Sequence, residues 1–194
     1  MTAPDATDQI GDGPTGASET PAVGGAAEPR WLTPDEQRTW RAFYAASTVF
    51  LACIDRELQH DAGVPHAYYE ILVALSESPA RRLRMSDLAE RSLSSRSRLS
   101  HAVSRLEDAG WIGREPCPDD RRGSFAVLTD EGLSVLETAA GRHVEGVRRH
   151  LFDLLDAGDL GALQRISDKL VAHFAEFDPG MAKVISGLSP GPAG

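Results

Sequence analysis

Cysteine is scarce in this 194-residue chain, which has only Cys53 and Cys117. Two cysteines are too few for the disulfide framework that stabilises small secreted domains. The N-terminus has no basic region followed by an apolar stretch, and no apolar run is long enough to cross a membrane. These absences predict a cytoplasmic protein that does not associate with a membrane.

Enzyme signatures are also missing from the sequence. There is no Walker loop, no dinucleotide-binding fingerprint, no His-Glu-x-x-His motif and no Gly-x-Ser-x-Gly nucleophile elbow. The six histidines are scattered and form no short metal-ligand motif, so neither catalysis, a cofactor nor a metal site is expected. His143 and His150 are seven residues apart and could share a helix face, although solvated or core histidines explain them more simply.

Positive charge is scarce overall but is concentrated in one window. The net charge is −9, yet residues 79–122 hold ten arginines against seven acids, a local excess of +3. Such asymmetry favours a patch that binds a polyanion on a body that otherwise repels one. A solvated arginine-rich surface explains the composition equally well.

Large apolar residues are nearly absent from residues 1–30, which predicts a disordered acidic tail. Order is expected to begin at Thr33, which forms a capping box with Glu36. Apolar side chains then recur at helical spacing in several segments. The sequence predicts helices near 34–63, 66–77, 85–92, 94–110, 130–154 and 160–174, and short strands at 111–116 and 124–128.

The helix near 94–110 has two chemically distinct sides. Leu99, Ala102, Val103 and Leu106 fall on one side, opposite small hydroxyls, arginines and a histidine. Small side chains let a helix approach a duplex closely, while Arg and His reach base edges and phosphates. With the short helix before it, this pattern predicts a helix-turn-helix whose DNA-binding residues are Ser95, Arg96, Ser97, Arg98, Ser100, His101, Ser104 and Arg105.

The passage "EPCPDDRRGSFAVLTDEG", residues 115–132, places two arginines at the end of a predicted hairpin. After a recognition helix, such a hairpin is typical of a winged helix, in which Arg121 or Arg122 reaches the phosphates or the minor groove. A neighbouring aspartate, Asp119 or Asp120, can hold the loop by a charge-assisted bond. An ordinary charged hairpin is the alternative.

Over about residues 33–177 the chain resembles the MarR-type (multiple antibiotic resistance regulator) winged-helix repressors. The resemblance is carried by "MSDLAERS", by "SSRSRLSHAVSRLEDAGWI", by "REPCPDDRRGSFAVLTDEG" and by the long helix that follows. It implies that Asp120 supports the wing and that Arg122 enters the minor groove. It also implies an obligate homodimer; the long acidic N-terminal tail departs from the family pattern.

The fold expected is mainly α: a winged helix-turn-helix with a small β-hairpin wing and a helical dimerisation domain. Independently of the resemblance, the apolar stripe over 133–154 and 160–174 is more than one winged helix buries, which also predicts a homodimer. The expected divisions are a tail at 1–30, the first dimerisation helix at 31–64, the DNA-binding domain at 65–129, C-terminal dimerisation helices at 130–177 and a flexible tail at 178–194.

The function expected is a repressor that binds a pseudo-palindromic double-stranded DNA operator and is released by a small-molecule effector. The resemblance implies an effector pocket where the first two helices meet the DNA-binding lobe and the long helix at 130–154, so Tyr44, Ser47, His66 and Tyr69 are candidates to line it. Core packing explains the tyrosines as well. The alternatives are a protein-interaction module without DNA binding and a metal- or thiol-responsive regulator. For the thiol reading, Cys53 is expected to be buried and Cys117 to be exposed near the wing.

Overall fold

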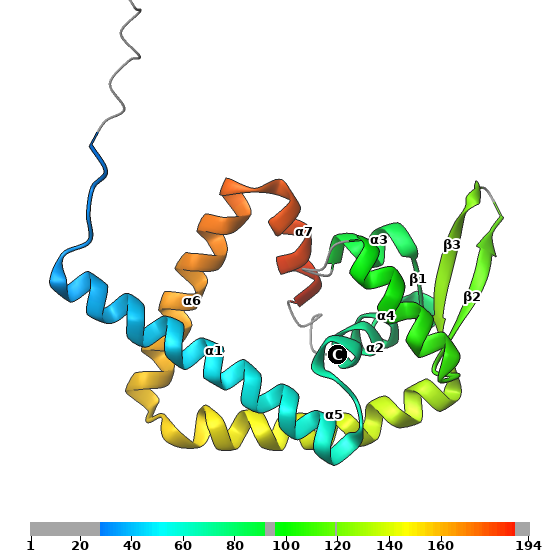
Figure 1. Ribbon diagram of the computed structural model, residues 1–194, viewed down its shortest axis with the longest axis horizontal. Helices are drawn as coiled ribbons and strands as arrows, with labels where there is room; N and C mark the ends of the chain where they lie inside the picture. Colours follow the sequence, from blue (N-terminus) through cyan, green and yellow to red (C-terminus); the bar gives the residue numbers. More distant parts are fainter. Residues whose placement is uncertain (1–27, 92–95, 119, 189–194) are drawn as a thin grey trace, which may run out of the picture. The chain divides into compact units, whose positions relative to one another are not determined.

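The computed structural model describes residues 28–91, 96–118 and 120–188 and divides the chain into two units, 1–39 and 40–194 (Figure 1). In the first unit, helix α1 (Pro34–Ala62) begins and continues into the second. The predicted capping box is confirmed: Thr33 N–H donates to Glu36 Oε2 at 2.8 Å, and Glu36 N–H donates to Thr33 Oγ1 at 3.2 Å. The tail predicted at 1–30 lies almost wholly outside the described residues.

The second unit is mostly helical with one small sheet. Its antiparallel strands have the order β1-β3-β2, so β3 is central. The elements after α1 are α2 (His66–Ser76), η1 (Pro79–Arg81), β1 (Arg82–Arg84), α3 (Met85–Arg91), α4 (Arg96–Asp108), β2 (Ile112–Cys117), β3 (Asp120–Leu128), α5 (Asp130–His150), η2 (Phe152–Leu154), α6 (Ala157–Phe177) and α7 (Pro179–Leu188). This arrangement confirms the mainly helical fold with a hairpin.

One apolar core joins α2, α3, α4, the sheet and α5. Leu99, Val103 and Leu106 of α4 are buried, as their spacing predicted, and they pack with Leu72 and Leu88. Burying side chains of this size contributes about 1.5–3 kcal/mol each to folding. The core therefore fixes which side of α4 remains exposed.

Two features of the sheet differ from the sequence prediction. Strand β1 was not expected, because "RLR" is too short to display an alternating pattern; Leu83 points its apolar side chain into the core opposite Ala126. Strand β3 begins at Asp120, four residues before the predicted start, because Cys117 pairs with Asp120 and extends the ladder. The arginine pair thus belongs to a strand and not to a turn.

The C-terminal helices also differ from the prediction. Helix α5 ends at His150, because Leu151 leaves the helical region with φ −133°, and η2 follows. The predicted flexible tail from 178 is wrong for residues 179–188, which form α7 with Val184 buried. Asp178 accepts a hydrogen bond from Gly180 N–H at 2.8 Å and so caps the new helix, which packs on α3 and α6.

Candidate nucleic-acid interface

Helix α4 exposes the side that the sequence predicted for DNA. Its backbone begins at Arg96, and Ser95 lies outside the described residues, as does the side chain of Arg96. The remaining predicted contacts all have exposed side chains, although their role in binding DNA stays a prediction: Ser97, Arg98, Ser100, His101, Ser104 and Arg105.

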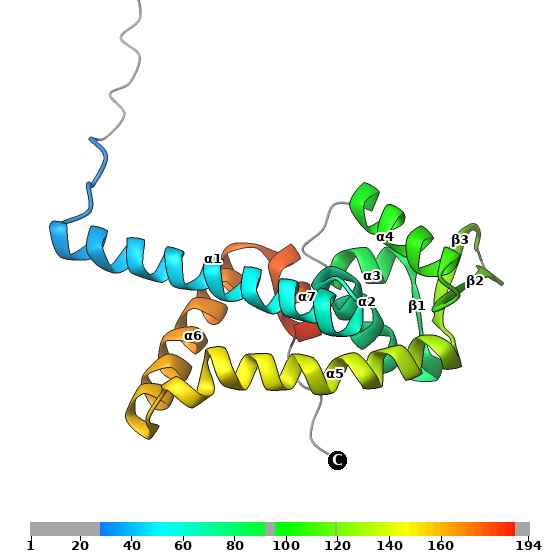
Figure 2. The same ribbon diagram turned by 60° about the horizontal axis from the view of Figure 1, so that its bottom comes forward.

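The end of α4 places the hairpin immediately beside it. Gly110 has φ +77°, a left-handed conformation that glycine adopts without steric strain. Gly110 N–H donates to the Glu107 carbonyl and Trp111 N–H to the Leu106 carbonyl, both at 2.9 Å. The chain therefore reverses at once, and β2 and β3 lie next to α4 in both views (Figures 1 and 2).

The far end of the hairpin is closely packed around Gly123. A Cβ added there would lie 2.8 Å from Asp120 Oδ2 and 3.2 Å from Cys117 Sγ, so only glycine fits without displacement. Cys117 is buried, and the prediction of an exposed thiol is wrong, because its sulfur packs inside the hairpin. Arg121 and Arg122 are described by their backbone in β3 alone, so the support of Arg122 by Asp120 stays a prediction.

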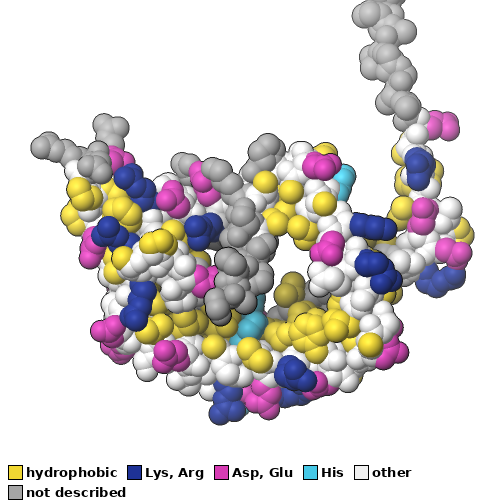
Figure 3. Space-filling model, turned by 180° about the vertical axis from the view of Figure 1, so that it is seen from behind, with side chains coloured by type: hydrophobic (Ala, Val, Ile, Leu, Met, Phe, Trp, Pro, Cys, Tyr) yellow, Lys and Arg dark blue, Asp and Glu magenta, His cyan; other side chains and the backbone are white. Residues whose placement is uncertain are grey.

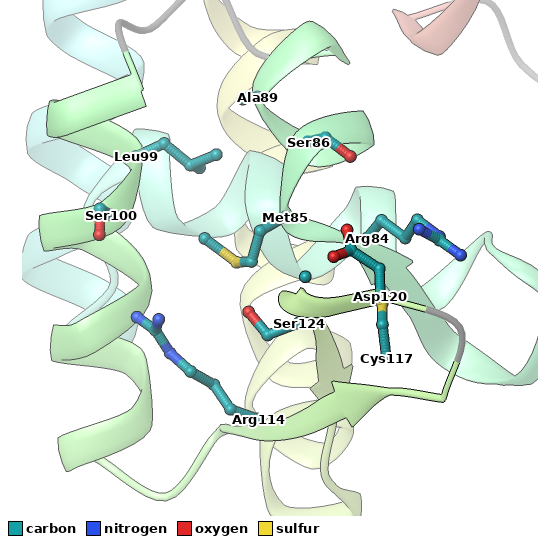
Figure 4. Close-up of a pocket in the computed structure, with 11 residues that line it drawn as sticks. Arg84, Met85, Ser86, Ala89, Leu99, Ser100, Arg114, Cys117, Asp120 and Ser124 are labelled. Atoms are coloured by element: carbon teal, nitrogen blue, oxygen red, sulfur yellow. The ribbon is translucent and has the colours of Figure 1, made fainter.

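A groove of about 400 Å³ separates α4 and α3 from the hairpin (Figure 4). Arg114 of β2 extends across it: Nε donates to Glu107 Oε2 at 2.9 Å and Nη2 donates to Ser104 Oγ at 3.2 Å. Sequence reasoning missed this link, because a glutamate and an arginine on either side of a glycine turn do not by themselves indicate a contact. The groove is lined by Arg84, Met85, Ser86, Ala89, Leu99, Ser100, Arg114, Cys117, Asp120, Gly123 and Ser124.

Several arginines of the basic window have partners within the chain. Arg82 and Arg84 lie over the ring of Phe125, at 4.8 and 5.5 Å from its centroid, on the side of the sheet away from the core. Arg82 also pairs with Glu115 at 3.5 Å. Part of the local positive charge is therefore used to cover the sheet.

Two of the four predicted effector residues lie together. His66 and Tyr69 of α2 have ring centroids 6.2 Å apart, and His143 of α5 lies 4.7 Å from Tyr69 and 5.5 Å from His66. Tyr44 instead is exposed, and its ring centroid lies 5.7 Å from that of Trp40. Ser47 is half-buried on α1. The sequence missed His143 as a member of this aromatic cluster, because the contact depends on how α2 and α5 pack.

Burial perturbs two groups of this cluster. Desolvation, and then the neighbouring charge of His66, lowers the pKa of His143 below its usual 6.5. Desolvation, and then Glu77, raises the pKa of Tyr69 above its usual 10.0. Nδ1 of His143 is buried and makes no hydrogen bond within the described part of the chain.

His150 does not join His143, although both occupy α5. Its Nε2 lies 2.7 Å from Glu57 Oε1 of α1, with Arg149 Nη1 at 3.7 Å from the same oxygen. Among the residues that the structure describes, no group of three or more His, Cys, Asp or Glu side chains is arranged to hold a metal ion. Cys53, predicted to be buried, is half-buried. No helix in the described ranges is long and apolar enough to cross a bilayer.

Helices α2, α3 and α4, followed by the β2–β3 hairpin, define a winged-helix domain. A family model described as the MarR family matches residues 62–123. The chain is 50% identical to Sco3205, a MarR family transcriptional regulator from Streptomyces coelicolor solved in complex with DNA, with a TM-score of 0.71 over 77% of this chain and 93% of that one.

A second solved structure from Streptomyces coelicolor, the MarR family regulator AbsC, is 43% identical, with a TM-score of 0.70 over 76% of this chain and 99% of that one. The HTH-type transcriptional regulator PapX of Escherichia coli is 27% identical over 114 residues, which are 59% of this chain and 69% of PapX. The chain belongs to the MarR family of transcriptional regulators.

Proposed function

We propose that the protein is a sequence-specific DNA-binding repressor that acts as a homodimer on a pseudo-palindromic operator and functions without catalysis. The observation that carries the proposal is the exposed face of α4, rich in Ser, Arg and His, directly beside a hairpin that holds Arg121 and Arg122. The DNA-bound structure of Sco3205, half of whose aligned residues are identical, supports the same use here.

We assign the side chains the following roles. Arg98 and His101 face the major groove, and Ser97 lies in the first turn of α4, where backbone N–H groups favour phosphate, while Arg96 and Ser95 keep the DNA-contacting roles predicted from the sequence. Arg122 enters the minor groove and Asp120 supports it. The flanking contacts come from Ser100, Ser104, Arg105 and Arg121.

A homodimer is supported by apolar side chains that remain exposed. Helix α6 has 21 residues and no buried side chain among those described, yet it carries Leu163, Ile166, Leu170 and Phe174. On α1, Trp40, Phe43 and Leu51 are more than half exposed. Hydrophobic side chains are visible at the surface on the face in Figure 3, and patches of this kind mark protein interfaces.

A small-molecule effector would act through the cluster of His66, Tyr69 and His143. Tyr44 and Ser47, the other two residues predicted to line the pocket, belong to α1. Aromatic faces with a few polar atoms suit an aromatic ligand, and the buried Nδ1 of His143 supplies a polar atom for it. Under this proposal an effector releases DNA from the wild type, and Tyr69→Ala reduces that response without weakening DNA binding itself.

The proposal is tested by selecting genomic fragments with the purified protein and sequencing them. A repressor of this kind enriches a pseudo-palindrome whose half-sites are about one helical turn, ~34–36 Å, apart. Enrichment of no sequence above the input would contradict the proposal and favour the protein-interaction alternative.

A further inference from the structure

Arg114 connects the hairpin to helix α4 at two points. Its guanidinium donates from Nε to Glu107 and from Nη2 to Ser104, at 2.9 and 3.2 Å, and these acceptors lie three residues apart on one face of the helix. The guanidinium is a planar fork with fixed donor directions, so two simultaneous bonds determine both its distance and its orientation. The side chains of Arg114 and Glu107 are only 32% and 39% exposed, which strengthens their pairing relative to a fully solvated ion pair.

This connection spans the groove shown in Figure 4. The apolar core reaches the hairpin at Ile112 of β2 and at Ala126 of β3, which is the cross-strand partner of Arg114, and the hairpin then continues alongside the groove toward Asp120. The outer part of the hairpin therefore depends on polar contacts for its position relative to α4. In a DNA complex that position matters, because the duplex fixes the distance between its major and minor grooves.

We propose, on the basis of the function proposed above, that Arg114 is a positioning residue that holds the hairpin at the distance from α4 at which both contact DNA together. Arg114 acts through Glu107 and Ser104. Holding the two elements in place before binding lowers the conformational entropy that is lost when the complex forms. The contribution of Arg122 to affinity then depends on Arg114.

A double-mutant cycle measures this dependence. Fluorescence anisotropy with one operator duplex at one salt concentration gives the dissociation constants of wild type, Arg122→Ala, Arg114→Ala and the double variant. Arg122→Ala weakens binding about tenfold in the wild-type background. In the Arg114→Ala background it weakens binding by less than about threefold, because the hairpin no longer holds its position.

Glu107→Gln separates positioning from simple electrostatics. Removing a negative charge beside the DNA-binding face strengthens binding if only the net charge matters. If only the net charge matters, the effect of Arg122→Ala is the same in Glu107→Gln as in the wild type. The positioning role predicts instead that the effect of Arg122→Ala is smaller in Glu107→Gln, as it is in Arg114→Ala. Arg114→Lys retains the charge without the planar fork and gives an intermediate coupling.

Arg82→Ala is the matched control, since Arg82 is also a sheet arginine paired with a glutamate, Glu115, but on the side of the sheet away from the core. The full effect of Arg122→Ala persists in this background. Circular dichroism and light scattering verify that each variant is folded and has the wild-type mass. An undiminished effect of Arg122→Ala in both Arg114→Ala and Glu107→Gln overturns the inference, whereas a wild type that binds no DNA overturns the proposed function and the inference with it.

Discussion

At the scale of single residues, two glycines of α5 have opposite surroundings. A Cβ at Gly146 would lie 3.3 Å from both Glu57 Oε2 and Ile54 Cδ1 of α1, whereas nothing lies within 4 Å of a Cβ at Gly141. The Glu57 carboxylate is hydrogen-bonded to His150, with Nε2 at 2.7 Å from Oε1, so it cannot easily move away from an added methyl group. The glycine at 146 therefore allows α1 and α5 to approach each other.

These surroundings predict different effects of the same substitution. Gly141→Ala raises the free energy of unfolding by about 1 kcal/mol through helix propensity. Gly146→Ala gains the same helix propensity, but the added methyl group overpacks the contact with α1, which costs about 1–3 kcal/mol. The free energy of unfolding is therefore unchanged or lower. Urea unfolding at one protein concentration measures both, and equal stabilisation by the two substitutions would refute the close packing at Gly146.

The lowered pKa of His143 predicts a dependence of stability on pH. Below pH 6.5, His143 is protonated in the unfolded chain but stays neutral in the folded protein until the pH reaches its lowered pKa. The unfolded state therefore binds more protons, and the free energy of unfolding falls as the pH falls. The stability that neutral His143 contributes is fully present above pH 6.5 and is lost as the pH falls through the folded-state pKa. His143→Gln should lose less stability than the wild type between pH 7.5 and pH 5.5 in urea titrations; equal losses would show that His143 does not contribute.

At the scale of elements, α7 is the part of the chain that differs most from the expectation of a tail. It packs on α3 and buries Val184. Truncation after Asp178 should lower the free energy of unfolding by about 1–3 kcal/mol through lost apolar burial. Removal of residues 1–28 is the control and should leave the melting temperature unchanged, because that segment has almost no large apolar side chains. The same melting temperature for both truncations would mean that α7 contributes nothing.

The sequence predicted correctly those elements whose own residues carry a periodic or capping pattern. The buried and exposed sides of α4 follow from the spacing of Leu99, Val103 and Leu106, and α1 begins where Thr33 and Glu36 predict. Strand β1 has three residues and depends on pairing with β3, so its own sequence cannot reveal it. The Arg114–Glu107 link and the position of His143 depend on contacts between elements, which periodicity does not encode.

At the scale of the whole molecule, the exposed apolar side chains of α1 and α6 predict association of two copies. Light scattering at micromolar concentration should give twice the 20.8-kDa chain mass. Ile166→Glu places a charge on the exposed apolar face of α6 and should shift the population toward monomer, while Arg165→Glu, which changes a charge on the side of the same helix away from Leu163 and Leu170, should not. A monomeric wild type would contradict the dimer.

Because the chain has a net charge of −9, most of its surface repels DNA, and the proposed function depends on the surface formed by α4 and the hairpin. The most direct test of that surface is a salt series of anisotropy titrations with wild type, Arg98→Ala and Arg122→Ala. Arg98→Ala should weaken binding by about 1–3 kcal/mol and relax the preference at one base position. Arg122→Ala should lower the slope of log affinity against log salt by about one, with the greatest loss on A·T-rich flanks. Unchanged affinity in both variants, with fold and dimer intact, would contradict the account and favour a winged-helix dimer that binds a protein partner.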